Sequence, residues 1–178
     1  MRRVLLLMGL VVAFTPMAPA FDTWYVSTNS ASDGPGTSWM NAFHSIQEAV
    51  DGAGADDLVL VTNGVYNSGG AVASVYDLTN RVCITNGITV RSVNGPTQTF
   101  IIGAADPIGT NGTAAIRCAS IASNCVLSGF ALTNGHTMGA TGSSPDETSG
   151  GGAFLDRGGT LSNCHVRACN ALQSGGGD

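Results

Sequence analysis

The chain has 178 residues, a net charge of −5 and a charged fraction of 11%, and all seven of its basic residues are Arg. Because no Lys/Arg cluster could neutralise phosphates, this composition excludes nucleic acid as a partner. The hydrophobic fraction of 43% is ordinary, so a folded domain is expected rather than a disordered chain.

The segment 1–20 has the pattern of an export signal. Two Arg residues are followed by an apolar run over 4–14 and by the small residues of Ala18-Pro19-Ala20. The run suits a signal peptide and is short for a membrane span. We predict a signal peptide over 1–20 and an exported protein without a transmembrane segment, located outside the cell, at its surface or in the periplasm. An uncleaved N-terminal anchor is the alternative.

A strand, a loop and a helix are expected over 21–55. Trp24-Tyr25-Val26 reads as a short strand, and the segment 44–53 places Ile46, Ala49, Val50 and Ala53 on one face of a helix. An apolar helix face at this point would cover the open end of a stack of coils, whose backbone edge would otherwise pair with another chain.

A repeated tripeptide organises the remaining chain, 56–178. Thr-Asn-Gly begins at residues 62, 85, 110 and 133, with offsets of 23, 25 and 23, and a triple Gly at 150–152 returns at 175–177. The intervening segments are short and rich in Val, Ile and Thr, which favours a β-solenoid whose coil length matches these offsets. The Asn side chains would either stack in a ladder or serve only as turn formers.

A loop insertion is expected at about 137–150. Ser-Asn-Cys recurs at 123–125 and 162–164, an offset of 39 that is well above the expected coil length. The segment 137–150 has a polar, Gly-rich composition that would account for the excess. Such a loop either carries a binding surface or is a solvent-exposed connection that the fold tolerates.

The five cysteines are an odd number, so at least one is free or pairs outside this chain. Their spacing follows the repeat and favours small buried residues between coils, with a disulfide framework as the alternative in an exported protein. No C-x-x-C spacing points to structural zinc. They are Cys83, Cys118, Cys125, Cys164 and Cys169.

Several segments resemble exported bacterial right-handed parallel β-helix proteins of the pectin-lyase-like superfamily. The resemblance is carried by Trp24-Tyr25-Val26, Gly36-Thr37-Ser38-Trp39, the helix segment Ile46-Gln47-Glu48-Ala49-Val50, and Gly150-Gly151-Gly152-Ala153-Phe154 followed by Leu161-Ser162-Asn163-Cys164. It implies an all-β fold: a right-handed, single-stranded parallel β-helix (β-solenoid) with an N-terminal capping helix. The Gly-Gly-Ala-Phe element is also similar to repeats of polymorphic outer-membrane adhesins, but their Phe two residues before Asn is absent.

The acidic residues do not form a recognisable catalytic pattern. A calcium-dependent lyase needs converging carboxylates and a basic residue, and a glycosidase needs two carboxylates about the scissile bond. Asp56-Asp57 is the only pair of adjacent Asp residues and lies where the helix leads into the next strand, while the other Asp residues are scattered. We predict no catalytic residue, no metal site and no cofactor, with calcium the one ion that the resemblance would allow.

Four residues are candidates for a binding face: Asp156, Arg157, His165 and Arg167. Strand alternation puts His165 and Arg167 on the face opposite Cys164 and Val166. They would form either a shallow sugar-binding strip or an ordinary solvated strand face.

The sequence therefore predicts a structural, adhesive or glycan-contacting protein without catalysis in this segment. Its expected partners are polysaccharide or cell-envelope components. The alternative is a polysaccharide lyase or glycoside hydrolase whose active site lies in coils beyond this chain. Because 175–178 matches the start of a coil, we expect a fragment of a longer protein whose exposed last coil would self-associate.

Overall fold

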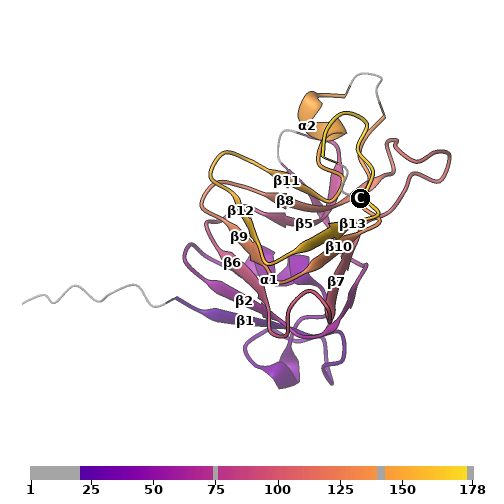
Figure 1. Cartoon of the computed structure of the whole chain (residues 1–178). Helices are drawn as coiled ribbons and strands as arrows, with labels where there is room; N and C mark the ends of the chain where they lie inside the picture. The colour runs from indigo at the N-terminus through magenta and orange to yellow at the C-terminus, as the bar shows by residue number, and fades with distance from the viewer. Residues whose placement is uncertain (1–20, 74–75, 140–142, 176–178) are drawn as a thin grey trace, which may run out of the picture.

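The computed structural model describes residues 21–73, 76–139 and 143–175, which wind into a parallel β-solenoid of about four turns (Figure 1). The expected signal peptide (1–20) and the end of the expected new coil (176–178) lie outside the described residues. Within the described part, no helix is both long and apolar enough to cross a membrane.

Three sheets run along the solenoid. The first contains β1 (Thr23–Val26), β2 (Leu58–Val61), β6 (Thr89–Ser92), β9 (Val126–Ser128) and β12 (Thr160–Ser162). The second contains β3 (Gly64–Tyr66), β7 (Thr99–Ile102), β10 (Ala131–Thr133) and β13 (His165–Arg167). The third contains β4 (Ala71–Val72), β5 (Thr79–Ile84), β8 (Ile116–Ile121) and β11 (Ala153–Leu155). Apart from the antiparallel pair β4–β5, the named strands pair in parallel, so the predicted all-β parallel solenoid is confirmed.

The coil length predicted from the tripeptide is wrong, because the coils are longer. In the first sheet Leu58 lies beside Thr89, Thr89 beside Val126 and Val126 beside Thr160. The Thr-Asn-Gly motifs occupy different corners: 62–64 between the first and second sheets, 85–87 between the third and first, and the other two between the second and third. The motif therefore marks bends rather than coils, because each bend needs residues that tolerate a turn.

One corner of each coil, before the first-sheet strand, contains a residue with a left-handed backbone conformation, and this feature repeats with the coil. The residue two positions before each first-sheet strand from β2 onward has a positive φ: Asp56 (69°), Gly87 (68°), Asn124 (61°) and Gly158 (90°). Only Gly adopts this conformation freely, and Asn and Asp tolerate it better than other residues. These stacked turns are thus made by three residue types.

The segment 137–150 belongs to the connection between β10 and β11, which contains the short helix α2 (Pro145–Thr148). In the preceding coil the corresponding connection, between β7 and β8, covers 103–115, whereas here it covers 134–152. The connection is therefore long in both coils, and the one that contains 137–150 is the longer. The two Ser-Asn-Cys motifs lie at different corners, so their offset does not measure the excess.

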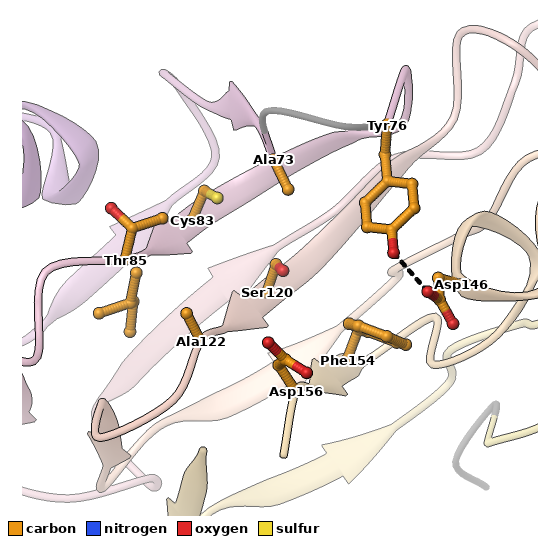
Figure 2. Close-up of a pocket in the computed structure, with 10 residues that line it drawn as sticks. Ala73, Tyr76, Cys83, Thr85, Ser120, Ala122, Asp146, Phe154 and Asp156 are labelled. Carbon is orange, nitrogen blue, oxygen red and sulfur yellow. Dashed lines mark hydrogen bonds between the residues drawn. The ribbon is translucent and has the colours of Figure 1, made fainter. Parts of the chain in front are cut away.

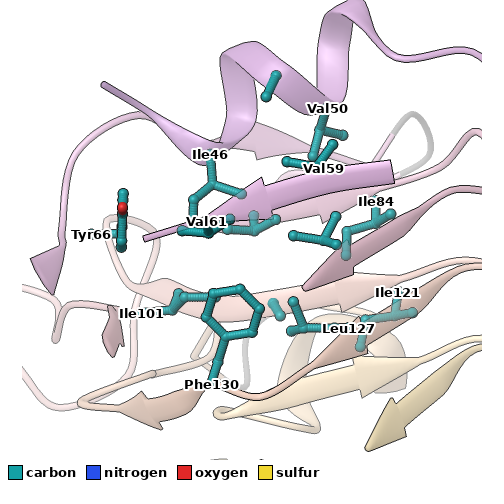
Figure 3. Close-up of a cluster of buried hydrophobic side chains, with 14 of the residues drawn as sticks. Ile46, Val50, Val59, Val61, Tyr66, Ile84, Ile101, Ile121, Leu127 and Phe130 are labelled. Atoms are coloured by element: carbon teal, nitrogen blue, oxygen red, sulfur yellow. The ribbon is translucent and has the colours of Figure 1, made fainter. Parts of the chain in front are cut away.

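The core fills the interior of the stack. Val59, Val90, Leu127 and Leu161 occupy equivalent positions of successive coils, and Phe130 packs among the same buried side chains (Figure 3). All five cysteines are free thiols, three buried and two half-buried, as the interpretation of small buried residues predicts.

The capping helix is present as α1 (Ile46–Gly52), preceded by the single 3-10 turn η1 (Trp39–Asn41). Ser45 and Glu48 form a capping box at its start. Ile46 and Val50 point into the core beside the first coils (Figure 3). The helix therefore covers the apolar end of the solenoid, as predicted.

Candidate functional site

A groove of ≈ 230 Å³ lies on the outer face of the third sheet (Figure 2). Its floor is one row of side chains, because Cys83 of β5 pairs in register with Ser120 of β8, and Ser120 with Phe154 of β11. We call it the third-sheet groove. Its lining consists of Ala73, Tyr76, Cys83, Ile84, Thr85, Ser120, Ala122, Asp146, Phe154 and Asp156.

A buried guanidinium holds one wall of the groove in place. Arg117 of β8 is 2% exposed. It donates to the carbonyl oxygens of Asp146 in α2 and of Ser149 just after it, and to the Asn80 side chain at 3.1 Å. Its guanidinium carbon lies 5.0 Å from the centre of the Phe154 ring, a cation–π distance. Arg117 therefore fixes both α2 and the aromatic ring against the sheet.

Burial lowers the pKa of Arg117 to about 10, while the negative charges of Asp146 and Glu147 oppose that effect. The side chain consequently stays protonated at neutral pH. Its Nε atom is buried and has no hydrogen-bond partner among the described residues.

The segment before β5 closes the groove from the other side. The Tyr76 hydroxyl donates to the Asp146 carboxylate (Figure 2), and this bond is the main cause of the raised pKa of Tyr76, followed by desolvation and the nearby charges of Asp146, Asp156 and Glu147. Glu147 accepts hydrogen bonds from the backbone N–H groups of Asp77 at 2.7 Å and Ser144 at 2.9 Å. Two connections that are distant in sequence are thereby joined over the sheet.

Of the four candidate residues from the sequence, only Asp156 lines this groove. Its Oδ1 atom accepts from the backbone N–H of Arg157 at 2.7 Å, and Arg157 lies in the exposed turn after β11. His165 and Arg167 are exposed on β13 of the second sheet, with half-buried Val166 between them. The predicted alternation along β13 is confirmed, but the four residues do not form one surface.

The sequence interpretation missed Tyr76, Asp146 and Phe154. Asp146 comes from the segment 137–150 that was expected either to carry a binding surface or to be a plain loop, and no spacing rule connects it with Asp156. Phe154 precedes Asp156 by two positions, the interval that places two side chains on the same side of an extended segment. That interval was the available signal.

Among the residues that the structure describes, no group of three or more His, Cys, Asp or Glu side chains could hold a metal ion. The groove offers two carboxylates, two aromatic rings and the hydroxyl groups of Thr85 and Ser120. This set can form hydrogen bonds and pack against an apolar surface.

No protein-family model matches the sequence. No curated protein matches it either. Among solved structures, pectin methylesterase in complex with hexasaccharide VII is 16% identical, with a TM-score of 0.48 over 89% of this chain and 47% of the enzyme chain. A point variant of pectin methylesterase in complex with hexasaccharide IV is also 16% identical, with a TM-score of 0.42 over 84% of this chain and 50% of the other. The chain therefore spans about half the length of the structures that it matches.

Proposed function

We propose that this chain is an exported β-solenoid that binds a polysaccharide in the third-sheet groove without catalysing a reaction on it. The observation that carries the proposal is the groove's combination of Tyr76 and Phe154 with Asp146 and Asp156. A sugar ring presents an apolar C–H face and an edge of hydroxyl groups. Aromatic rings match the face, and carboxylates accept hydrogen bonds from the edge.

The direction of the groove favours a linear chain. Its floor crosses three parallel strands in register, from Cys83 through Ser120 to Phe154, so it follows the solenoid axis. Strands in a sheet hold their spacing rigidly at roughly 4.8 Å. The groove therefore presents a regular, preformed series of side chains to a polymer, which reduces the ordering cost of binding.

The test is calorimetric binding of oligosaccharides of equal length to the whole chain and to Phe154→Ala. Removing the ring should weaken binding about tenfold, since an aromatic contact of this kind is worth roughly 1.4 kcal/mol. Phe100→Ala is the matched control, because Phe100 is a half-buried ring on β7 of the second sheet, and it should bind as the unchanged chain does.

Equal losses in the two variants would place binding elsewhere. Absence of binding to every oligosaccharide would overturn the proposal.

A second candidate function is glycan cleavage, either here or in a longer protein whose further coils complete a polysaccharide lyase or glycoside hydrolase. The observation that favours it is that Asp146 and Asp156 line one groove, since glycosidases act with two carboxylates. Reducing ends and unsaturated products should be measured with and without calcium. Turnover that disappears in both Asp146→Asn and Asp156→Asn would replace the binding-only proposal.

Export, which the signal pattern of residues 1–20 predicts, and a partner among polysaccharides or cell-envelope components are part of this proposal. Fractionation of cells that produce the whole chain should find it outside the cytoplasm, and deletion of 2–20 should retain it inside. Retention of both forms inside would remove extracellular polysaccharide as a partner.

A further inference from the structure

The charge distribution of the third-sheet groove indicates which sugars it takes. Resting on the proposed polysaccharide binding, we propose that the groove selects glycans whose sugar units carry a protonated amino group and disfavours glycans built from uronic acids. Three features decide this preference: where the carboxylates lie, how the buried cation Arg117 is held and which acceptor atoms remain open.

Two carboxylates face the ligand space. Asp146 comes from α2 and Asp156 directly follows β11, and both line the groove (Figure 2). A carboxylate has about four acceptor positions, and the hydrogen bonds to the side chains of this pair come from the Tyr76 hydroxyl and the Arg157 backbone N–H within the described residues. Each carboxylate therefore keeps acceptor capacity for a ligand.

The buried cation beside the groove is held by the protein. Arg117 is 2% exposed, and its ring neighbour Phe154 lines the groove. Its Nη1 and Nη2 atoms donate to Asn80, Asp146 and Ser149, and its Nε atom is buried. A carboxylate on a bound sugar could not reach this guanidinium without breaking the bonds that hold α2.

A third carboxylate adds to the negative potential beside the groove. Glu147 follows Asp146 in α2 and accepts from the backbone N–H of Asp77, the residue after Tyr76. Its carboxylate therefore lies near the same wall of the groove as Asp146. Arg157 is exposed beside Asp156, and it is the backbone N–H of Arg157 that donates to that carboxylate.

The physical consequence is a preference by charge. A uronate would meet like charge on both sides of the groove, whereas an ammonium group would form charge-assisted hydrogen bonds with Asp146 or Asp156. Such bonds are roughly twice as strong as those between neutral groups, so an affinity gain of about tenfold is expected over the same sugar with its amine blocked.

The experiment compares three oligomers of equal length by calorimetry with the whole chain: glucosamine, N-acetylglucosamine and galacturonate. The expected order of affinity is glucosamine first, N-acetylglucosamine about tenfold weaker, and galacturonate weakest. Raising the ionic strength should reduce the advantage of glucosamine, because partly exposed charges are screened by salt.

Single substitutions test whether the groove carboxylates cause the preference for the amino sugar. Asp156→Asn keeps an oxygen for the Arg157 N–H and removes one of the two charges that favour an ammonium group, so it should weaken the binding of glucosamine more than that of N-acetylglucosamine and bring the two affinities together. Asp33→Asn, at an exposed acid beside the N-terminal helix, is the matched control and should preserve the preference. Asp146→Asn provides a second test in the event that either variant folds poorly.

Equal affinities for glucosamine and N-acetylglucosamine, or tightest binding of galacturonate, would overturn the amino-sugar inference and leave polysaccharide binding intact. Absence of binding by all three oligomers would overturn both. Loss of the preference in Asp33→Asn would show that the net charge of the chain, rather than the groove, sets the selectivity, and would also overturn the inference.

Discussion

The side chain of Gln47 pairs with backbone groups at an open edge of the third sheet. Its side-chain oxygen accepts from the backbone N–H of Cys83 at 2.7 Å, and its side-chain nitrogen donates to the Cys83 carbonyl at 3.3 Å. The amide thus makes both bonds that a neighbouring strand would make with β5. Gln47 is buried, so these groups on Cys83 would otherwise be shielded from water without a partner.

Gln47→Met should lower the free energy of unfolding by about 1–3 kcal/mol, because it keeps the shape of the side chain and leaves two buried backbone groups unpaired. Urea unfolding of the whole chain measures this loss. Gln173→Met, at an exposed position, is the matched control and should change stability by less than about 0.5 kcal/mol. Equal stabilities of the two variants would show that water satisfies the β5 edge.

Asp57 joins the capping region to the first strand. Its carboxylate accepts from the backbone N–H of Asp22 and Gly54, each at 2.8 Å, and from the Trp24 indole N–H at 2.9 Å. Desolvation raises the pKa of Asp57, but the three hydrogen bonds together lower it more, and the net pKa lies below the ordinary value of 3.8. Asp57 is therefore a structural carboxylate.

The stability contributed by Asp57 should depend on pH. A depressed folded pKa means that the contribution is fully present above pH 3.8 and is lost as the pH falls through the lower folded value. Asp57→Asn should flatten this part of the curve of unfolding free energy against pH, whereas Asp56→Asn should retain it. An unchanged curve in Asp57→Asn would contradict the assigned role of these hydrogen bonds.

At the scale of the element, the turn before each first-sheet strand needs a residue that accepts the left-handed conformation. Before β6 that position holds Gly87, where a Cβ atom would meet nothing within 4 Å. Gly87→Ala should therefore cost about 1–2 kcal/mol through backbone strain alone. Gly109→Ala, at a loop position with ordinary contact distances, should be nearly neutral. Thermal unfolding of both variants measures these changes in stability. An unchanged stability of Gly87→Ala would mean that the turn changes its backbone conformation to accept the Cβ atom.

The strands, turns and capping helix also explain what the sequence could and could not predict. Short β-branched segments and the apolar face of 46–53 were sufficient for the fold class and the capping helix. These features were not sufficient for the coil length, because Thr-Asn-Gly occurs at bends of several corners. The position that repeats with the coil, two residues before each first-sheet strand, is occupied by Asp, Gly or Asn. Asp156 was identifiable as an outward acid, but its partner Asp146 reaches the groove through contacts that are distant in sequence, because Arg117 and Tyr76 hold the β10–β11 connection over the sheet.

At the scale of the whole molecule, stability should decline toward the last coil. Within the described residues, β13 pairs with β10 on one side, whereas β10 is paired on both sides with β7 and β13. Val166 and Leu161 are half-buried, in contrast to the buried Leu132 and Leu127 of the preceding coil. Amide hydrogen exchange should be slowest in β8 and β10 and fastest in β13. Equal protection of β13 would indicate that another chain or a further segment covers it.

The solenoid also separates its faces, and this separation is what makes the functional proposal testable. Phe154 of the third sheet and Asp156, which directly follows β11, line the groove, while His165 and Arg167 lie on the second sheet. Because the strands of each sheet are held in register by their neighbours, a ligand on one face should leave the other face undisturbed.

The most direct test of binding in the third-sheet groove is an NMR titration of the isotope-labelled chain with an oligosaccharide that binds it. We expect the amide shifts to change along the groove floor, at Cys83, Ser120 and Phe154, and to stay constant at His165 and Arg167. Shift changes confined to β13 and the outer face of the second sheet would contradict the proposed site.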